Sequence, residues 1–286
     1  NNALLPVVSA VALQSFERPL RILIFGGTGI IVLGVGIWGL NRSLLQPFTA
    51  SGRTLLDTVS AYRKRERGPR VVALGGGTGL STLLRGVKEY TSNLTAIVTV
   101  ADDGGSSGEL RKSTGILPPG DIRNCLAALS NDEALLSQIF QYRFAGTTGL
   151  NGHSLGNLFI TAMAEVTGSF EEGVAESGRV LAVQGRVLPA TLHDVKLAAD
   201  VRLRGQTKDT QIRGESLISA AGGQIRRVWL EPGAPLAFPP TLQAILNAEL
   251  IVVGPGSLFT SLLPNLLVPD LAEALRVSRA LKFFVC

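Results

Sequence analysis

From position 70 onward, apolar residues occur in two alternating arrangements, short continuous runs and runs with helical spacing. Residues 71–74 form a continuous run of the kind that is buried in parallel sheets, and the apolar residues at 80, 83, 84 and 87 share one face of a helix. The same alternation predicts further strands at 94–100, 250–253 and 282–285, and further helices at 121–130, 133–143, 154–166 and 242–248. Residues 178–230 are rich in strand-forming residues and less regular. The sequence therefore predicts an α/β fold, a mostly parallel sheet with helices on both faces.

The N-terminal part of the chain has a different pattern, an uncharged stretch of 19 residues from 22 to 40. Arg18 and Arg21 precede it and Arg42 follows it. A helix of this length spans about 30 Å, the thickness of the hydrocarbon core of a membrane. The alternative is a buried strand, turn and helix, because residues 25–30 read FGGTGI and resemble a nucleotide-binding loop. We favour a transmembrane helix, because no polar face follows this loop.

These patterns divide the chain into a membrane anchor at 1–41, a basic linker at 42–69 and a folded domain at 70–286. The net charge of +5 comes from the first part of the chain, since residues 1–70 contain nine basic and three acidic side chains. The domain itself is close to neutral, which argues against a nucleic-acid-binding protein. Two cysteines and two histidines are too few for a disulfide framework, and they lack the spacing of a zinc site.

A glycine-rich loop separates the first predicted strand of the domain from the helix that follows it. Its residues are Gly75, Gly76, Gly77, Thr78 and Gly79. Glycine lets the backbone approach a phosphate closely, and the free N–H groups at the start of the following helix face the anion. The loop lacks the lysine of a P-loop and the complete GxGxxG pattern, so a tight structural turn remains the alternative.

Two adjacent carboxylates, Asp102 and Asp103, follow the second predicted strand. Open sheets bind ligands at such strand ends, and paired carboxylates suit Mg²⁺, a ribose hydroxyl or a reacting hydroxyl. A turn capped by an aspartate is the alternative, and it accounts for only one of the two. Glycines and serines at 104–108 predict a mobile loop that closes over a ligand.

Two further candidate groups lie where other predicted helices begin. Asn124, next to Arg123, lies in the first turn of the helix at 121–130, for which Asp121 is the expected N-cap. A second strand-to-helix turn would offer bare amides to an anion. Its residues are Gly254, Pro255, Gly256 and Ser257.

His153 and Asn157 are one helical turn apart at the start of the helix at 154–166. Their spacing places both side chains on one edge, where they would contact a phosphate or a sugar. The alternative is that His153 or Ser154 only caps the helix.

Five motifs occur in an order that resembles a known family. They are VVALGGGTGLSTLL, TVADDGGSSGELR, PPGDIRN, GHSLGNL and VVGPGSLFTSLLPNLLV. Together they resemble the YvcK branch of the CofD/YvcK family over residues 70–286. Members of this branch are gluconeogenesis factors that bind UDP-sugars and are needed for cell shape on gluconeogenic carbon sources. The resemblance implies a Rossmann-like α/β domain.

The resemblance also implies a ligand and a site. Residues 75–79 and Ser81 would contact the phosphates of a nucleotide-sugar, either UDP-N-acetylglucosamine or another UDP-sugar. Asp103 lies where the related 2-phospho-L-lactate transferases place a metal, with Mg²⁺ as the candidate, or a substrate carboxylate. The same crevice would be lined by Asn124, His153, Asn157 and the turn at 254–257. The family continues past the last predicted strand with a polar loop, and if that loop closes the pocket, this chain binds its ligand weakly.

We therefore expect a nucleotide-sugar-binding regulator without turnover, able to form a homo-oligomer and with no nucleic acid as partner. One alternative is a CofD-like 2-phospho-L-lactate transferase, which joins a phospho-lactyl group to a deazaflavin precursor. The other is a dinucleotide oxidoreductase in which Asp102 holds the ribose, although the GGGTGL loop matches the dinucleotide pattern poorly. Basic residues after the uncharged stretch predict a cytoplasmic domain anchored to the inner face of the membrane through residues 22–40.

Overall fold

The computed structural model describes residues 17–49, 60, 63–131, 133–146 and 149–285 of the 286-residue chain. The chain divides into two units, Asn1–Tyr62 and Arg63–Cys286. The second unit contains all of the candidate site residues.

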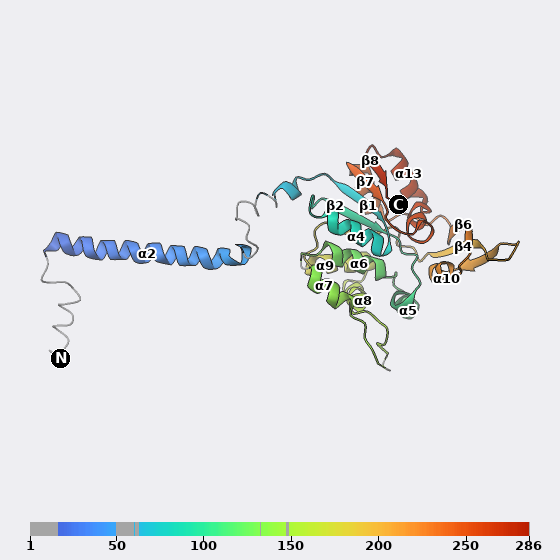
Figure 1. The fold of residues 1–286 in the computed structure, drawn as a ribbon, viewed down its shortest axis with the longest axis horizontal. Helices are drawn as coiled ribbons and strands as arrows, with labels where there is room; N and C mark the ends of the chain where they lie inside the picture. The colour runs from blue at the N-terminus through green and yellow to red at the C-terminus, as the bar shows by residue number, and fades with distance from the viewer. Residues whose placement is uncertain (1–16, 50–59, 61–62, 132, 147–148, 286) are drawn as a thin grey trace. The chain divides into compact units, whose positions relative to one another are not determined.

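A five-stranded parallel sheet forms the centre of the second unit (Figure 1). Val71 of the middle strand is in register with Leu94 on one side and Leu250 on the other, so the central strands also end at a common edge. The predicted parallel sheet is confirmed, and the carboxyl ends of its central strands lie together. In spatial order the strands are β3 (Arg186–Pro189), β2 (Leu94–Val98), β1 (Val71–Gly75), β7 (Leu250–Val253) and β8 (Leu281–Phe284).

Side chains of β1 alternate between two hydrophobic cores, one on each face of the sheet. Val71 and Ala73 pack into one core, and Val72 and Leu74 pack into the other. The first core is covered by α4 (Gly77–Val87), α6 (Gly120–Leu129), α8 (Leu155–Thr167) and α9 (Phe170–Val180), with α7 (Glu133–Gln141) beside α6 and α8. The second is covered by α11 (Pro239–Asn247) and α13 (Pro269–Val277). Helices on both faces are thus confirmed (Figure 1).

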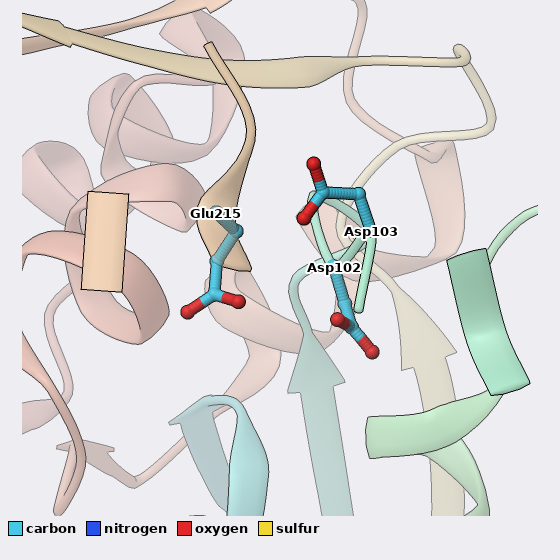
Figure 2. Close-up of side chains that lie close together, drawn as sticks. All are labelled: Asp102, Asp103 and Glu215. Carbon is cyan, nitrogen blue, oxygen red and sulfur yellow. The ribbon is translucent and has the colours of Figure 1, made fainter. Parts of the chain in front are cut away.

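A smaller antiparallel sheet occupies much of the region whose pattern is irregular in the sequence. Its central strand is β4 (Lys196–Arg202), whose alternate residues Leu197, Ala199 and Val201 are buried in the same core as Val72. The neighbours of β4 are β5 (Thr210–Arg213) and β6 (Gln224–Glu231), and the short helix α10 (Glu215–Ala220) follows β5. This part of the fold matters for the site because α10 begins beside the end of β2 (Figure 2).

The prediction of a mobile loop at 104–108 is wrong, because most of this segment is helical. Helix α5 (Gly105–Thr114) begins directly after the paired aspartates, and its residues Ser106 and Ser107 are buried. Gly108 lies so close to the carbonyl group of Asp103 that a Cβ atom would overlap it. Tertiary contacts therefore stabilise a helix whose glycines and serines have poor helix propensity.

The described part of the first unit is dominated by one long helix, α2 (Arg18–Thr49). Its stretch Arg18–Leu40 has a mean hydropathy of 2.1, and none of it is buried. Among the described residues this is the one unbent helix that is long and apolar enough to cross a membrane, and a signal sequence has the same properties. The alternative of a strand, turn and helix at 22–40 is wrong, because all of these residues are helical. The helix continues past residue 41 into the expected linker.

Candidate functional site

The first glycine-rich loop connects β1 to α4 at the carboxyl edge of the sheet. Gly77 has a φ of +64°, and a Cβ atom on Gly76 would lie 2.7 Å from Oδ2 of Asp121. Both positions therefore require glycine, one for its backbone conformation and one for space. Ser81 is buried, and its hydroxyl donates to the carbonyl oxygen of Thr78 at 2.9 Å. The Ser81 hydroxyl thus has a partner inside its own helix.

The second glycine turn packs directly against the first one. Gly254, which has a φ of +92°, and Pro255 follow β7. A Cβ atom on Gly79 would lie 2.5 Å from the carbonyl oxygen of Pro255, so the two backbones are in close contact. Ser257 then leads into the π-helical turn η1 (Leu258–Leu262). The structure therefore brings together the two turns that the sequence marks as candidate anion sites.

Asn265 connects the first glycine loop to η1, and we did not predict it from the sequence. It lies in α12 (Leu263–Leu266) and is buried. Its side-chain amide donates to the carbonyl oxygens of Gly75 at 3.1 Å and of Ser261 at 2.8 Å. The position falls inside the last of the five motifs, which is the only sign of it in the sequence.

Three carboxylates gather where β2 ends (Figure 2). Asp102 and Asp103 follow β2 and Glu215 begins α10, and one oxygen from each lies within 4.8 Å of the others. Asp102 accepts a hydrogen bond from the N–H group of Gly104, and Asp103 accepts one from that of Ser216, both at 2.9 Å. Carboxylate oxygens are the side-chain ligands that Mg²⁺ prefers, so the chemistry of this donor set fits the ion.

Glu215 is a further residue that the sequence did not reveal. It lies in the irregular region, far along the chain from its two partners, and no local pattern marks it. Burial raises the pKa of Glu215, and the negative charges of Asp102 and Asp103 act in the same direction. Burial also raises the pKa of Asp102, where hydrogen bonds from Gly104 and Ser107 oppose the effect. A divalent cation at this cluster would offset the accumulated negative charge.

Asp121 connects the acidic cluster to the first glycine loop. It lies in the first turn of α6, where Pro119 is the N-cap, so the expected capping role of Asp121 is wrong. Its carboxylate accepts a hydrogen bond from the backbone N–H of Gly77. Burial raises the pKa of Asp121 to about 6, and the negative charge of Asp102 contributes. One amide of the glycine loop is therefore held by a carboxylate of the same chain.

A hydrogen-bond network joins α5 to the start of α8. The hydroxyl of Ser106 lies 3.1 Å from Nδ1 of His153 and accepts a hydrogen bond from Nδ2 of Asn157 at 3.1 Å. The same amide nitrogen lies 3.4 Å from the hydroxyl of Ser107. Ser154 caps α8 by accepting from the N–H of Asn157, so its capping role is confirmed. His153 and Asn157 do lie together, and both contact α5.

A cavity of about 230 Å³ lies between this network and the acidic cluster. It unites three predicted site residues, Asp102, Asn124 and Asn157, and adds Arg143, which we did not predict. The complete lining is Asp102, Gly104, Gly105, Ser106, Ser107, Gly120, Asp121, Arg123, Asn124, Arg143 and Asn157. The two glycine turns lie outside this lining. Larger cavities of about 730 and 530 Å³ lie at the amino ends of β1 and β2 and between α9 and β3.

Known proteins resemble this chain over most of its length. The family model described as 2-phospho-L-lactate transferase CofD matches residues 71–286. A gluconeogenesis factor of Bacillus subtilis is 50% identical over 219 residues, which are 76% of this chain and 67% of the relative. A gluconeogenesis factor of Halalkalibacterium halodurans is 52% identical over 217 residues, which are 76% of this chain and 66% of the relative.

A relative from Nostoc is 52% identical over 264 residues, which are 90% of this chain and 56% of the relative. The chain thus spans between about half and two thirds of the length of these relatives. A crystal structure of a Bacillus halodurans protein matches with a TM-score of 0.72 and 51% identity, and the match covers 77% of this chain and 69% of that chain. The expected resemblance and α/β fold are both confirmed. The chain belongs to the CofD family, in the YvcK-like branch whose members are named gluconeogenesis factors.

Proposed function

We propose that this chain binds a UDP-sugar, with UDP-N-acetylglucosamine as the first ligand to test, and regulates cell shape during gluconeogenic growth. The observation that carries the proposal is the contact between the two glycine turns, at Gly79 and Pro255. Each turn lies at the carboxyl edge of the sheet and precedes a helical segment, so each offers backbone N–H groups. A diphosphate suits such paired amides. The names of the relatives support the link to gluconeogenesis.

The charge around the turns argues that the phosphates bind together with a divalent cation. Glu215 is hydrogen bonded to Thr260 of η1, and Asp121 to Gly77, so carboxylates lie beside both turns. A diphosphate alone would be repelled by these carboxylates. Mg²⁺ held by Asp102, Asp103 and Glu215 would supply positive charge at this place. We therefore expect the affinity for the UDP-sugar to depend on magnesium.

Titration calorimetry of the full chain in detergent micelles tests the proposal. UDP-N-acetylglucosamine, GTP and NAD are titrated in parallel, each with and without Mg²⁺. We expect heat from the UDP-sugar alone, and only when Mg²⁺ is present. Binding of NAD without binding of the UDP-sugar would favour the dinucleotide alternative instead.

The Gly77→Ala variant tests whether the first turn carries the binding. Space does not limit this change, because the nearest atom to the new methyl group is Oγ of Ser261 at 4.0 Å. Alanine rarely adopts a φ of +64°, so the turn should shift and the affinity should fall by at least about tenfold. Gly86→Ala is the matched control, because it lies in the same helix and its Cβ atom meets nothing within 4 Å. Normal binding by Gly77→Ala would show that the loop is only a structural turn.

Transferase activity is the second candidate, favoured by the three-carboxylate cluster and by the description of the matching family model. Carboxylates at a strand end suit metal-assisted phosphoryl transfer. We expect no product when the chain is incubated with a phospho-lactyl nucleotide donor, a deazaflavin acceptor and Mg²⁺. A product that requires Mg²⁺ and is lost in Asp103→Asn would show that the chain is an enzyme and would overturn the proposal of a regulator without turnover. Asparagine at 103 can still accept the N–H of Ser216, so this variant removes charge while keeping the local hydrogen bond.

A further inference from the structure

Two arginines line the cavity of about 230 Å³, and the proposed nucleotide site assigns no ligand group to them. They are Arg123 and Arg143, and both meet at Ser154. Arg123 donates to the Ser154 hydroxyl at 2.6 Å, and Arg143 forms an isolated antiparallel bridge with the Ser154 backbone. The guanidinium group of Arg143 donates to the carbonyl oxygen of Gly152 at 2.8 Å, and its positive charge acts on that of Arg123. A phosphate group in the cavity would offset this repulsion.

The partners of Arg123 leave room for such an anion. Arg123 is buried, and in the described part of the chain its side-chain partners are the neutral oxygens of Asn124 and Ser154. These contacts use three of the five guanidinium N–H groups, so two are free for a bidentate anion. The ion pairs found among the described residues include neither Arg123 nor Arg143. Burial, and then the charge of Arg143, lowers the pKa of Arg123, whereas the negative charges of Asp121 and Asp102 oppose the effect.

The cavity is also lined by hydrogen-bond acceptors. Asn157 is 2% exposed, and its Oδ1 atom has no hydrogen-bond partner among the described residues although its Nδ2 atom is bound by serines. Asp102 and Asp121 line the cavity as well. A buried acceptor without a donor is costly, and hydroxyl groups of a ligand would satisfy it.

We infer that this cavity binds a small hydroxylated molecule that carries one phosphate group, such as a sugar phosphate. The phosphate contacts Arg123 and Arg143, and the hydroxyl groups donate to Asn157 and to the two carboxylates. The volume lies below the range of about 300–1,000 Å³ typical of drug-sized ligands, so the cavity suits a monosaccharide phosphate better than a whole nucleotide. The inference rests on the proposed function in assigning the nucleotide phosphates to the glycine turns, which makes the sugar phosphate a second ligand.

The test uses calorimetry of the full chain in detergent micelles with glucose 6-phosphate, glucose and inorganic phosphate as probes. Arg143→Gln is the informative variant, because Arg143 is exposed and its replacement leaves the buried Arg123 in place. Arg179→Gln is the matched control, since it removes the same charge from an exposed arginine of α9 that lies outside the cavity.

We expect glucose 6-phosphate to bind, glucose not to bind, and inorganic phosphate to bind more weakly than the ester. Arg143→Gln should weaken the binding of glucose 6-phosphate by at least about tenfold, whereas Arg179→Gln should leave it unchanged. Equal binding by Arg143→Gln and the unchanged chain, or no binding of any phosphate, would overturn the inference. If glucose 6-phosphate binds as described and UDP-N-acetylglucosamine does not, the proposed function fails while this site remains.

Discussion

The charge of Asp121 lowers the stability of the folded chain at neutral pH. Its pKa rises from 3.8 to about 6 because the carboxyl group is buried and lies beside the negative Asp102. The folded state therefore binds a proton more tightly than the unfolded state does. It follows that the free energy of unfolding falls as the pH rises from about 4 to about 6 and stays low above that range. A shift of about two pKa units corresponds to at most about 3 kcal/mol.

We expect Asp121→Asn to raise the free energy of unfolding at pH 7 by about 1–3 kcal/mol. Asparagine stays neutral, and its Oδ1 atom can still accept the N–H of Gly77. Thermal unfolding of the full chain in magnesium-free detergent solution measures the effect, and the gain should vanish near pH 4, where the aspartic acid is itself neutral in the folded chain. Glu89→Gln, at an exposed carboxylate, is the control and should change the stability neither at pH 7 nor at pH 4. A lower melting temperature of Asp121→Asn than of the unchanged chain at pH 7 would contradict the conclusion that the charge of Asp121 destabilises the fold.

Individual residues could be predicted where the residue type alone explains why it is needed at that position. Gly76 and Gly77 stand in a pattern that requires glycine, and the structure shows a lack of space at one and a positive φ at the other. Glu215, Arg143 and Asn265 could not be predicted, because each acts on partners that are distant in sequence. The folded sheet, which brings the ends of β1, β2 and β7 to one edge, creates the neighbourhoods of Glu215 and Asn265.

At the scale of elements, Lys88 joins the C-terminal ends of α4 and α6. Its buried side chain donates to the carbonyl oxygens of Ala128 at 2.7 Å and Ser130 at 3.1 Å. These carbonyl oxygens lie at the end of α6, where a helix lacks donors of its own and where a positive charge is favourable. The other end of α6 carries Asp121 and Arg123, so Lys88 helps to hold the site residues in place.

We expect Lys88→Met to lower the free energy of unfolding by about 1–3 kcal/mol, because it leaves buried carbonyl oxygens without their donor. Methionine keeps most of the apolar length of the side chain, so the loss reports on the hydrogen bonds and the charge. Chemical denaturation of the full chain measures it. Lys112→Met removes an exposed lysine of α5 and should have little effect. Equal stabilities of the two variants would show that Lys88 does not support α6.

The comparison of α4 with α5 shows which elements could be predicted. Leucines in α4 recur with helical spacing, and two of them, Leu80 and Leu84, are fully buried, so local pattern and packing agree. The sequence of α5 is GSSGELRKST, which has no apolar stripe. It is helical because Asn157 binds its serines and because Arg111 is tied to the backbone carbonyl of Val195 at 2.6 Å. Contacts of this kind are invisible to a local pattern.

At the scale of the whole molecule, α2 is the described helix that is long and apolar enough to cross a membrane. We propose that it anchors the chain in a membrane, because its apolar side chains are exposed and the first basic residue after them is Arg42. The full chain should stay with the membrane fraction after a carbonate wash, whereas a chain that starts at Arg63 should not. A full chain found in the soluble fraction would contradict the anchor.

A paired substitution sharpens this test. Val32→Arg together with Val35→Arg places two charges in the middle of the apolar stretch, which is costly in a bilayer, and should release the chain from the membrane. Val166→Arg together with Leu236→Arg adds the same charges at exposed apolar positions of the second unit and should leave the chain in the membrane fraction. Release by both pairs would point to a contact other than α2.

Because Asp121 already accepts the N–H of Gly77, a phosphate that arrives at the first glycine loop replaces an anion that the chain itself provides. Binding at this amide is then an exchange, and the net affinity is the difference between two competing interactions. For a singly charged anion such as chloride, the free energy of binding to this amide is too small to displace the carboxylate of Asp121. A doubly charged phosphate accompanied by Mg²⁺ gains more, since the cation also draws the neighbouring carboxylates to itself. If the proposed function holds, the Asp121 carboxylate therefore keeps small anions such as chloride away from the phosphate-binding amide.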